Sequence, residues 1–535
     1  MRARRWYPNK GERDMISVLP RQVKANAMDI PLDHSTEIPV YQHLTSPSRK
    51  RMEEADALVL YYLEDRDIPW ERLPGGDALR TRWRRCRREG RPETWSTALP
   101  GPRGGRLFLS RQAGDANAFA RQDRGRRLAA DLMAEAPRRL LIAAARPDPA
   151  LDAAAQALLQ AVLLRACPMP TLKTRSEPVP RPGRIDCHDL TRPCDLTRLR
   201  MEVRGNHLAR WLTRLPANEL APASYRRRIE ALARAEGWKT DFLGLDRLRR
   251  QQAGAFLAVA QGSPEDSGAG ILHLRYRPPG RRRSRPPVAL VGKGICFDTG
   301  GVNIKSARYM HGMHEDMEGS AVALGTLLAL SRLEVDFAVD CYLALAENAI
   351  GPRAYKPNDV VRAANGTSIE IIHTDAEGRM VLADTLWLAA RKGPGLIIDY
   401  ATLTGACIQA LSTRYSGVFT NRPAWIPALI EAGRTSGERI WPFPLDPDFD
   451  QPLESEVADV KQCTLDAEAD HILAARFLQR FVPAETPWIH LDLAAGNHKG
   501  GLGAVPTDIT GFGVRLSLHL LLDQALPSPD EAPCS

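Results

Sequence analysis

Three ionisable side chains stand on one glycine-rich segment in the second half of the chain. The segment PVALVGKGICFDTGGVNIKS carries Lys293, Asp298 and Lys305 after an apolar run at Val288–Val291. The apolar run predicts a buried strand, and the glycines let the following loop turn tightly and approach a ligand. Open α/β sheets bind ligands in the crevice outside the carboxyl ends of their strands. The segment therefore predicts a ligand site in a loop at the end of this strand.

Carboxylates occupy two further segments that we expect to face the same crevice. Asp316 precedes a long helical pattern, and Asp375 and Glu377 stand two residues apart in HTDAEGR, after a predicted strand at 369–372. Hard divalent cations take oxygen ligands, whereas packed carboxylates without a partner are costly. Each acid alone is readily explained as a helix cap or a surface charge. The acids together with the two lysines favour a metal cluster.

The segments that must position these groups alternate between helices and strands. Beyond a proline-rich stretch at 168–184, helical patterns at HLARWLTRL and SYRRRIEALARAEG precede apolar runs at GAFLAVAQG, ILHLRYR and PVALVGKG, which we interpret as strands. ALVLYYL and LLIAAA predict strands nearer the N-terminus. The alternation predicts an α/β fold with a central mixed, mostly parallel sheet flanked by helices. We expect a smaller α/β domain at residues 1–185, ending in the proline-rich linker, and a larger catalytic domain at 186–535.

The excess of positive over negative charge lies entirely in the N-terminal part of the chain. The net charge is +9, but residues 1–200 contain 37 Lys and Arg against 25 Asp and Glu, and the remainder is slightly acidic. A basic run surrounds Trp83 with Arg80, Arg82, Arg84, Arg85, Arg87 and Arg88. Such a run is usually a solvated helix face. The alternative is a surface for nucleic acid or another polyanion, on which the aromatic ring stacks on a base while arginines neutralise phosphates.

Composition is that of an ordinary globular enzyme, with 44% hydrophobic and 26% charged residues. The basic start lacks the apolar run of a secretory signal. The longest apolar stretch, 150–167, is interrupted by polar residues, which predicts a buried or amphipathic helix and no membrane span. Nine scattered cysteines without a CxxC pair are typical of reduced thiols. We expect a cytoplasmic protein.

Four motif strings resemble the leucine (cytosol) aminopeptidase family. They are VGKGICFDTGG, MHEDMEG, HTDAEGRMVLADTL and DYATLTGA, and the resemblance extends from about Leu208 to Leu516. The spacing of TDAEGR from the upstream KG, FD, GG and K is far more specific than a single glycine motif. The resemblance implies a metallo-aminopeptidase that hydrolyses the N-terminal bond of short peptides through a water activated by two metals. It also implies a homohexamer.

The resemblance assigns a role to each group of the predicted site. It implies two zinc or manganese ions, the first held by Lys293, Asp298, Asp316 and Glu377 and the second by Asp298, Asp375 and Glu377. Lys305 would stay charged and stabilise the oxyanion of the tetrahedral intermediate. Arg379 would hold a bicarbonate that shuttles a proton. The substrate side chain would lie against Met313, Thr402, Gly405 and Ala494.

Four positions near the site depart from the residues usual in the family. They are His314, His373, Glu318 and Ser306. None is an implied ligand, so they affect the expected specificity, metal preference and rate, and we interpret the two histidines as hydrogen-bonded packing residues. The alternative function is that of a nucleic-acid-binding or structural protein that retains the aminopeptidase scaffold. The intact ligand set argues against that alternative.

Overall fold

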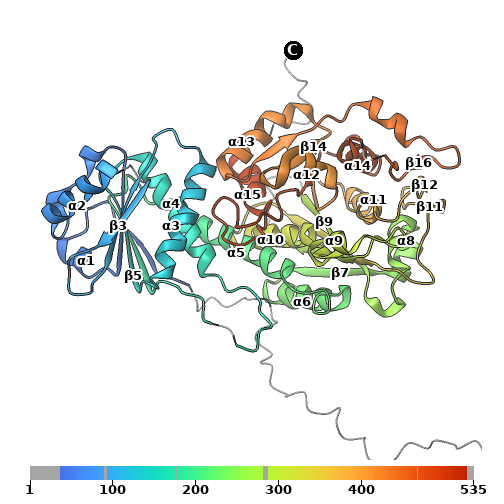
Figure 1. Ribbon diagram of the computed structural model, residues 1–535. Helices are drawn as coiled ribbons and strands as arrows, with labels where there is room; N and C mark the ends of the chain where they lie inside the picture. Colours follow the sequence, from blue (N-terminus) through green and yellow to red (C-terminus); the bar gives the residue numbers. More distant parts are fainter. Residues whose placement is uncertain are drawn as a thin grey trace, which may run out of the picture.

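Two sheets organise the chain, and each forms the centre of one α/β domain (Figure 1). The computed structural model describes residue 30 and residues 37–89, 93–175, 177–280, 287–466 and 468–526. The N-terminal sheet has six strands in the order β1-β6-β5-β2-β4-β3, and only β3 is antiparallel to its neighbour. The strands are β1 (Val40–Gln42), β2 (Ala57–Tyr62), β3 (Thr94–Ala98), β4 (Arg106–Arg111), β5 (Arg139–Ala144) and β6 (Arg184–His188).

Helices cover both faces of the N-terminal sheet. Helices α3 and α4 pack on one face, and α1 and α2 pack on the other, so β2 is buried along its whole length. The bounds are α1 (Arg49–Glu53), α2 (Gly76–Glu89), α3 (Ala118–Ala134) and α4 (Pro149–Ala166). The strands predicted at ALVLYYL and LLIAAA and the buried helix predicted at 150–167 are confirmed. No helix within the described ranges has both the length and the apolar character that crossing a bilayer requires.

The proline-rich stretch joins α4 to β6, and its described residues form no helix or strand before Arg184, where β6 begins. The chain then returns to the N-terminal sheet, where β6 pairs with both β1 and β5. The sheet therefore continues past residue 185, and the next element, α5 (Leu196–Thr213), packs against the catalytic domain.

The basic run lies on α2, and its aromatic residue is part of the core. Trp83 is 4% exposed and packs against Tyr62 and Trp95. The idea that Trp83 stacks on a base is therefore wrong, because the amphipathic helix turns this ring inward and its arginines outward.

The catalytic sheet has eight strands in the order β15-β14-β17-β13-β9-β10-β8-β7. Its four middle strands, β17, β13, β9 and β10, are parallel, which confirms the predicted mixed, mostly parallel sheet. The strands are β7 (Lys239–Gly244), β8 (Gly270–Tyr276), β9 (Val288–Asp298), β10 (Val339–Asn348), β13 (Leu396–Ala401), β14 (Ser416–Thr420), β15 (Ile440–Pro442) and β17 (Trp488–Asp492). A separate small sheet contains β11 (Val360–Arg362), β12 (Ser368–Glu370) and β16 (Val460–Lys461).

Helices also cover both faces of the catalytic sheet. One face carries α5, α6, α10, α13 and α15, and the other carries α8, α11 and α14. The remaining bounds are α6 (Pro222–Ala235), α7 (Leu245–Arg250), α8 (Gly254–Ala260), α9 (Ala307–Met310), α10 (Glu318–Arg332), α11 (Glu377–Ala390), α12 (Gly405–Leu411), α13 (Ile426–Ser436), α14 (Asp470–Gln479) and α15 (Val514–Asp523).

Two local predictions in the catalytic domain are wrong. GAFLAVAQG forms helix α8 and not a strand, since a short apolar run fits either structure and the packing of α8 on α11 decides it. The segment with Lys293 and Asp298 is not a loop, because β9 continues to Asp298. Gly292 lies within this strand, where a Cβ atom would meet Ser320 Cα of α10 at 2.4 Å. This glycine is required for the close approach of α10 and not for a turn.

The two domains are joined by an ion-pair network around Glu202 of α5. Glu202 is buried and pairs with Arg198 at 2.8 Å and with Arg515 of α15 at 3.1 Å. Arg515 also donates to Gln160 of α4 in the N-terminal domain. Burial would raise the pKa of Glu202, but the surrounding cationic side chains outweigh it and lower this pKa to about 2. The carboxylate is therefore more stable in the folded chain than in the unfolded one.

We expect Glu202→Gln to lower the free energy of unfolding by about 3 kcal/mol at pH 7. Because the folded pKa lies below the unfolded one, this stabilisation is complete above the unfolded pKa and is lost as the pH falls toward 2. The difference between variant and wild type should narrow between pH 5 and pH 3 in denaturant titrations followed by tryptophan fluorescence. Glu431→Gln, in an exposed pair with Arg434, is the control and should change little. A difference independent of pH would contradict the electrostatic explanation.

Candidate active site

The carboxyl end of β9 places two ionisable groups at the centre of the catalytic sheet. Lys293 lies within the strand and Asp298 is its last residue, and both are buried. The neighbouring strand β10 ends in Asn348, whose Nδ2 donates to Asp298 Oδ1 at 2.8 Å. The parallel strands thus bring Asp298 and Asn348 to one edge of the sheet, where the sequence predicts Asp298 but not Asn348.

Lys293 connects the segment that precedes α10 with the first residue of α11. Its Nζ lies 2.9 Å from Asp316 Oδ1 and 3.0 Å from Glu377 Oε1, and it donates to the carbonyl oxygen of Thr402 at 3.0 Å. A Cβ atom at Gly378 would lie 2.5 Å from this Nζ, so the glycine makes room for the lysine. Three segments separated in sequence therefore converge on one buried amine.

Lys305 lies beside the other two acids of the predicted site. Its Nζ is 2.8 Å from Asp298 Oδ2 and 2.5 Å from Asp375 Oδ1. Burial lowers the pKa of Lys305, but the carboxylates of Asp298 and Glu377 outweigh burial and raise it. Lys305 is therefore positively charged at neutral pH.

Burial favours the protonated, neutral form of the acids in this cluster. Burial, and then the charge of Asp298, raises the pKa of Glu377 to about 8. Burial likewise raises the pKa of Asp316 to about 6, although Lys293 opposes the shift. Burial lowers the pKa of Lys293, but the surrounding carboxylates outweigh it and raise the pKa overall. The cluster thus stabilises cations, and a metal that uses Lys293 as a neutral ligand must displace its proton.

The donor set fits divalent cations. One oxygen each from Asp298, Asp375 and Glu377 lies within 4.8 Å of the others. Asp316 Oδ2 and Glu377 Oε2 are buried and have no hydrogen-bond partner among the described residues. Buried oxygens without partners are costly, and oxygen is the ligand that hard cations prefer. The chain therefore offers both a ligand cage and a physical reason for metal to enter it.

The residues expected around the substrate side chain lie on elements next to the cluster. Thr402, directly after β13, donates through its hydroxyl to Asp316 Oδ1 at 2.7 Å. Met313 begins the 3-10 helix η5 (Met313–Glu315), immediately before Asp316. Gly405 is the first residue of α12, and a Cβ atom there would meet nothing within 4 Å. Ala494 follows β17, the parallel neighbour of β13, and is buried.

Arg379 is buried in the first turn of α11, where the protein already engages two of its nitrogens. One amino group donates to Asp470 Oδ1 at 2.7 Å, and the other donates to the carbonyl oxygen of Gln462 at 3.2 Å. The Nε atom is buried without a hydrogen-bond partner in the part of the chain that is described. A small anion would have to share the guanidinium with Asp470.

The four departures from the usual family residues have different environments. His373 Nδ1 accepts from the backbone N–H of Asp375 at 3.3 Å, in keeping with a hydrogen-bonded histidine. Glu318 is 1% exposed and contacts Gly496, and burial, with Glu315 adding, raises its pKa to about 8. His314 is partly buried, which lowers its pKa, and Ser306 precedes α9 without capping it through its side chain.

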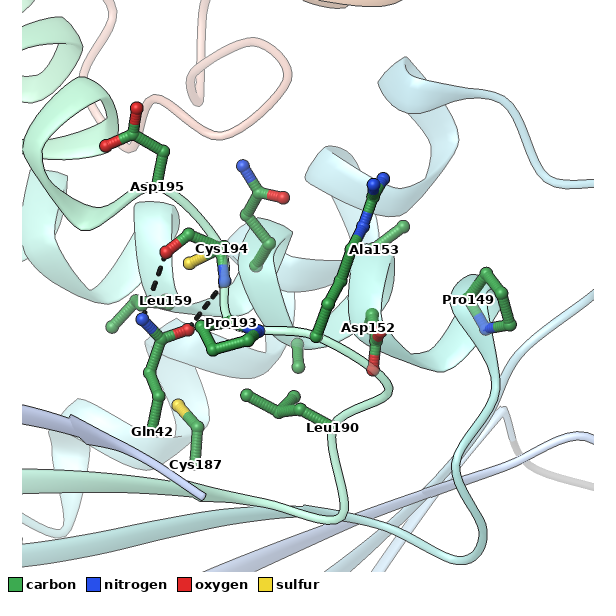
Figure 2. A pocket seen from close by; sticks show the side chains of 13 residues that line it. Gln42, Pro149, Asp152, Ala153, Leu159, Cys187, Leu190, Pro193, Cys194 and Asp195 are labelled. Carbon is green, nitrogen blue, oxygen red and sulfur yellow. Dashed lines mark hydrogen bonds between the residues drawn. The ribbon is translucent and has the colours of Figure 1, made fainter. Parts of the chain in front are cut away.

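An open cavity of about 360 Å³ lies beside the acids. It is lined by Asn303, Ile304, Lys305, Tyr309, His373 and Asp375. A second cavity of about 360 Å³ lies in the N-terminal domain, between α4 and the segment that follows β6 (Figure 2). There the side chain of Gln42 binds both the backbone N–H and the carbonyl oxygen of Cys194. Of these two cavities, the first adjoins the acids of the predicted site.

Sequence reasoning missed the residues that orient the predicted ligands. Asn348 donates to Asp298 and also to the carbonyl oxygen of Thr374, which accepts from Tyr355 as well. These bonds fix the segment that carries Asp375. A signal was available, because Asn348 ends an apolar strand in the same way as Asp298 ends its own.

Comparisons with known proteins agree with this geometry. The cytosol aminopeptidase family, catalytic domain, matches residues 207–518. A probable cytosol aminopeptidase of Rhodopseudomonas palustris (strain BisB18) is 42% identical over 330 residues, which are 60% of this chain and 63% of that protein. A probable cytosol aminopeptidase of Wolbachia pipientis wMel is 40% identical over 336 residues, 62% of this chain and 66% of that protein. The matched stretch therefore spans slightly less than two thirds of these relatives.

Two solved structures share the fold over most of their length. A tomato leucine aminopeptidase mutant superimposes with a TM-score of 0.77 at 25% identity, covering 91% of this chain and 97% of that one. The bottromycin maturation enzyme BotP, in complex with Mn, gives a TM-score of 0.73 at 31% identity, covering 87% of this chain and 99% of that one. The family match, the relatives and the shared fold together show that this chain belongs to the cytosol aminopeptidase family.

Proposed function

We propose that the protein is a metal-dependent aminopeptidase that hydrolyses the N-terminal bond of short peptides. The observation that carries the proposal is the cluster of Lys293, Asp298, Asp316, Asp375 and Glu377, in which only Asp375 is partly exposed. Two of these acids, Asp316 and Glu377, carry a buried oxygen that has no hydrogen-bond partner among the described residues. The names of the relatives support the reaction, and the manganese complex of BotP supports the type of metal. A scaffold that had lost the reaction would not need to keep costly buried carboxylates.

We assign two divalent ions, manganese or zinc, to the cluster. Four residues would hold one ion, Lys293, Asp298, Asp316 and Glu377, and three would hold the other, Asp298, Asp375 and Glu377. When bound, such a pair supplies Lewis acidity for activating water and polarising the scissile carbonyl. Asn348 keeps the Asp298 carboxylate in place, and Thr402 does the same for Asp316.

Lys305 has the position and charge of an oxyanion stabiliser. Its ammonium is held against Asp298 and Asp375 and faces the open cavity beside them. A preoriented cation stabilises the charge that develops on the carbonyl oxygen without the cost of reorienting solvent. We assign to Arg379 the binding of a bicarbonate that carries a proton to the leaving amine. Met313, Thr402, Gly405 and Ala494 would contact the side chain of the residue that is removed.

Removing bound metal should abolish hydrolysis. We expect a chelator to eliminate turnover of an aminoacyl anilide, and manganese, zinc or cobalt to restore it. The reason is that the proposed nucleophile is a water activated by the metals, and no side chain is assigned that role. Initial rates before and after metal addition, with metal content measured on the same samples, provide the test. Full activity in metal-free protein would rule out the proposed mechanism.

Substitutions should separate the ligands from Lys305. Glu377→Gln and Asp298→Asn should lose bound metal and activity together. Lys305→Ala should retain its metal and lose about 10²- to 10³-fold in kcat, the usual effect of removing one oxyanion donor. Lys499→Ala removes an exposed amine and is the control. If Lys305→Ala emptied the metal site, Lys305 would be a ligand or a structural residue, and its assigned role would be incorrect.

We propose that the protein forms a homohexamer and acts in the cytoplasm. The support is the membership of the cytosol aminopeptidase family. A hexamer whose active sites face an interior would restrict substrates to short peptides. Light scattering should give a mass near six times that of the 59.2 kDa chain. An active species of 59.2 kDa would contradict the hexamer.

A second proposal is weak binding of nucleic acid or another polyanion by α2. Five exposed arginines, Arg80, Arg82, Arg84, Arg85 and Arg88, have no carboxylate within ion-pair distance among the described residues. Arg87 differs, since it pairs with Asp65. Phosphates can neutralise this arginine face. Because Trp83 is buried and cannot stack on a base, we expect the face to recognise a polyanion through charge.

Binding through α2 should therefore depend steeply on salt and little on sequence. We expect labelled duplex DNA to bind the full-length protein at low salt, with log K falling by about 0.9 for each phosphate neutralised as log salt rises. Replacing the five exposed arginines by glutamine should abolish binding. Replacing Arg226, Arg227 and Arg228 on α6 by glutamine is the control and should not. Binding that persists without the α2 arginines would eliminate this surface as the site.

A further inference from the structure

A second cluster of potential metal ligands lies in the N-terminal domain, away from the catalytic sheet. His43 follows β1 directly, and Asp186 and His188 lie on β6. Each offers one ligand atom within 4.8 Å of the other two. Backbone pairing of β1 with β6, extended by the N–H of His43 to the carbonyl oxygen of Cys187 at 2.8 Å, holds the three residues together.

The three side chains share the face of the sheet opposite to the cavity of Figure 2. Gln42 and Cys187 are paired across β1 and β6, and both line that cavity, on the α4 side. Successive side chains of a strand point to opposite faces, so His43, Asp186 and His188 project from the other side. The cluster is thus separate from the cavity as well as from the catalytic acids.

His188 has the features of a prepared metal ligand. It is 1% exposed, and its Nδ1 lies 3.0 Å from the carbonyl oxygen of Thr45. An N–H at Nδ1 that donates to this carbonyl leaves a lone pair on Nε2, which is buried and has no hydrogen-bond partner in the described parts of the chain. Burial also lowers the pKa of His188, so the ring is neutral at neutral pH. Metal-bound histidines are commonly fixed by such a bond from the second nitrogen.

The other two side chains complete a set of two imidazoles and a carboxylate. Arg184 donates to both oxygens of Asp186, at 2.6 and 2.7 Å, which orients the carboxylate and leaves each oxygen a further lone pair. His43 Nε2 is 3.3 Å from Asp186 Oδ1, and its ring stacks on His188 with centroids 4.2 Å apart. Imidazoles bind metal in the ring plane, so His43 must rotate out of the stack. Its side chain is 27% exposed, so packing does not enclose the ring completely.

We propose that His43, Asp186 and His188 bind one zinc ion, separate from the catalytic metals. Zinc takes imidazole nitrogen and carboxylate oxygen at about 2.0–2.2 Å, and three protein ligands leave one position for water. The guanidinium of Arg184 opposes an added cation, but it also holds the carboxylate ionised and in place. Unlike the proposed aminopeptidase site, this cluster contains no lysine and only one acid, so its affinity depends on the two histidines.

The test compares zinc content in variants of the full-length protein. His188→Asn keeps an amide that can donate to the Thr45 carbonyl but removes Nε2, and His43→Gln changes a partly exposed ligand that should not impair folding. His207→Gln is the matched control, since His207 is another buried histidine bound to a backbone carbonyl, that of Pro168. It belongs to neither of the two candidate metal clusters found among the described residues. Each protein is equilibrated with zinc, freed of excess and analysed by elemental mass spectrometry.

We expect wild type and His207→Gln to retain one more zinc per chain than His188→Asn. His43→Gln should weaken zinc binding about tenfold or more in competition with a chromophoric chelator. Cobalt added in place of zinc should give a visible absorption component that is absent from His188→Asn. Equal zinc content in wild type and His188→Asn would overturn the proposal. A loss of the same size in His207→Gln would overturn it too, because the effect would then not be specific to the cluster.

Discussion

The catalytic domain depends on how it neutralises several carboxylates buried at one end of one strand. Asp298 ends β9. Asp316 approaches it from the segment before α10, Asp375 from the segment before α11, and Glu377 from the first residue of α11. The ammonium of Lys293 lies between two of these acids and that of Lys305 between the other two. Charges buried this deeply are tolerated only when they are paired, so the surrounding packing must bring every partner into place at once.

Small residues make that convergence possible. Gly292 lets α10 pack directly on β9, and Gly378 leaves space for the Lys293 side chain at the start of α11. Each is surrounded so closely that even a methyl group would collide with its neighbours. The local chemistry of the site is thus set by helix-to-strand distances as much as by the ionisable residues themselves.

The sequence was sufficient to predict the ionisable groups, because acids and lysines gathered at the ends of buried strands are costly unless they bind a ligand or one another. It was also sufficient for the class of sheet, which follows from the alternation of strands and helices. The sequence-based prediction was wrong where tertiary packing decides between two local structures. GAFLAVAQG forms helix α8 instead of a strand, and the glycine-rich segment after Val291 continues strand β9 instead of forming a loop. The prediction also misjudged Trp83, because an aromatic among arginines has the same pattern whether it faces solvent or the core. Asn348 was missed because a lone amide carries little weight until the strand beside it is known.

The contacts between the domains fix how the N-terminal domain is oriented. Gln122 of α3 donates to the carbonyl oxygen of Ser436, and the next residues, Gly437 and Glu438, lead into β15. The Glu438 carboxylate in turn accepts the backbone N–H groups of Gly513 and Leu516 at the start of α15. One short segment thus anchors both the basic domain and a helix of the catalytic core. Anything held by α2 or β6 would therefore be attached to the catalytic domain through hydrogen-bonded and ion-paired contacts between the domains as well as through the linking chain.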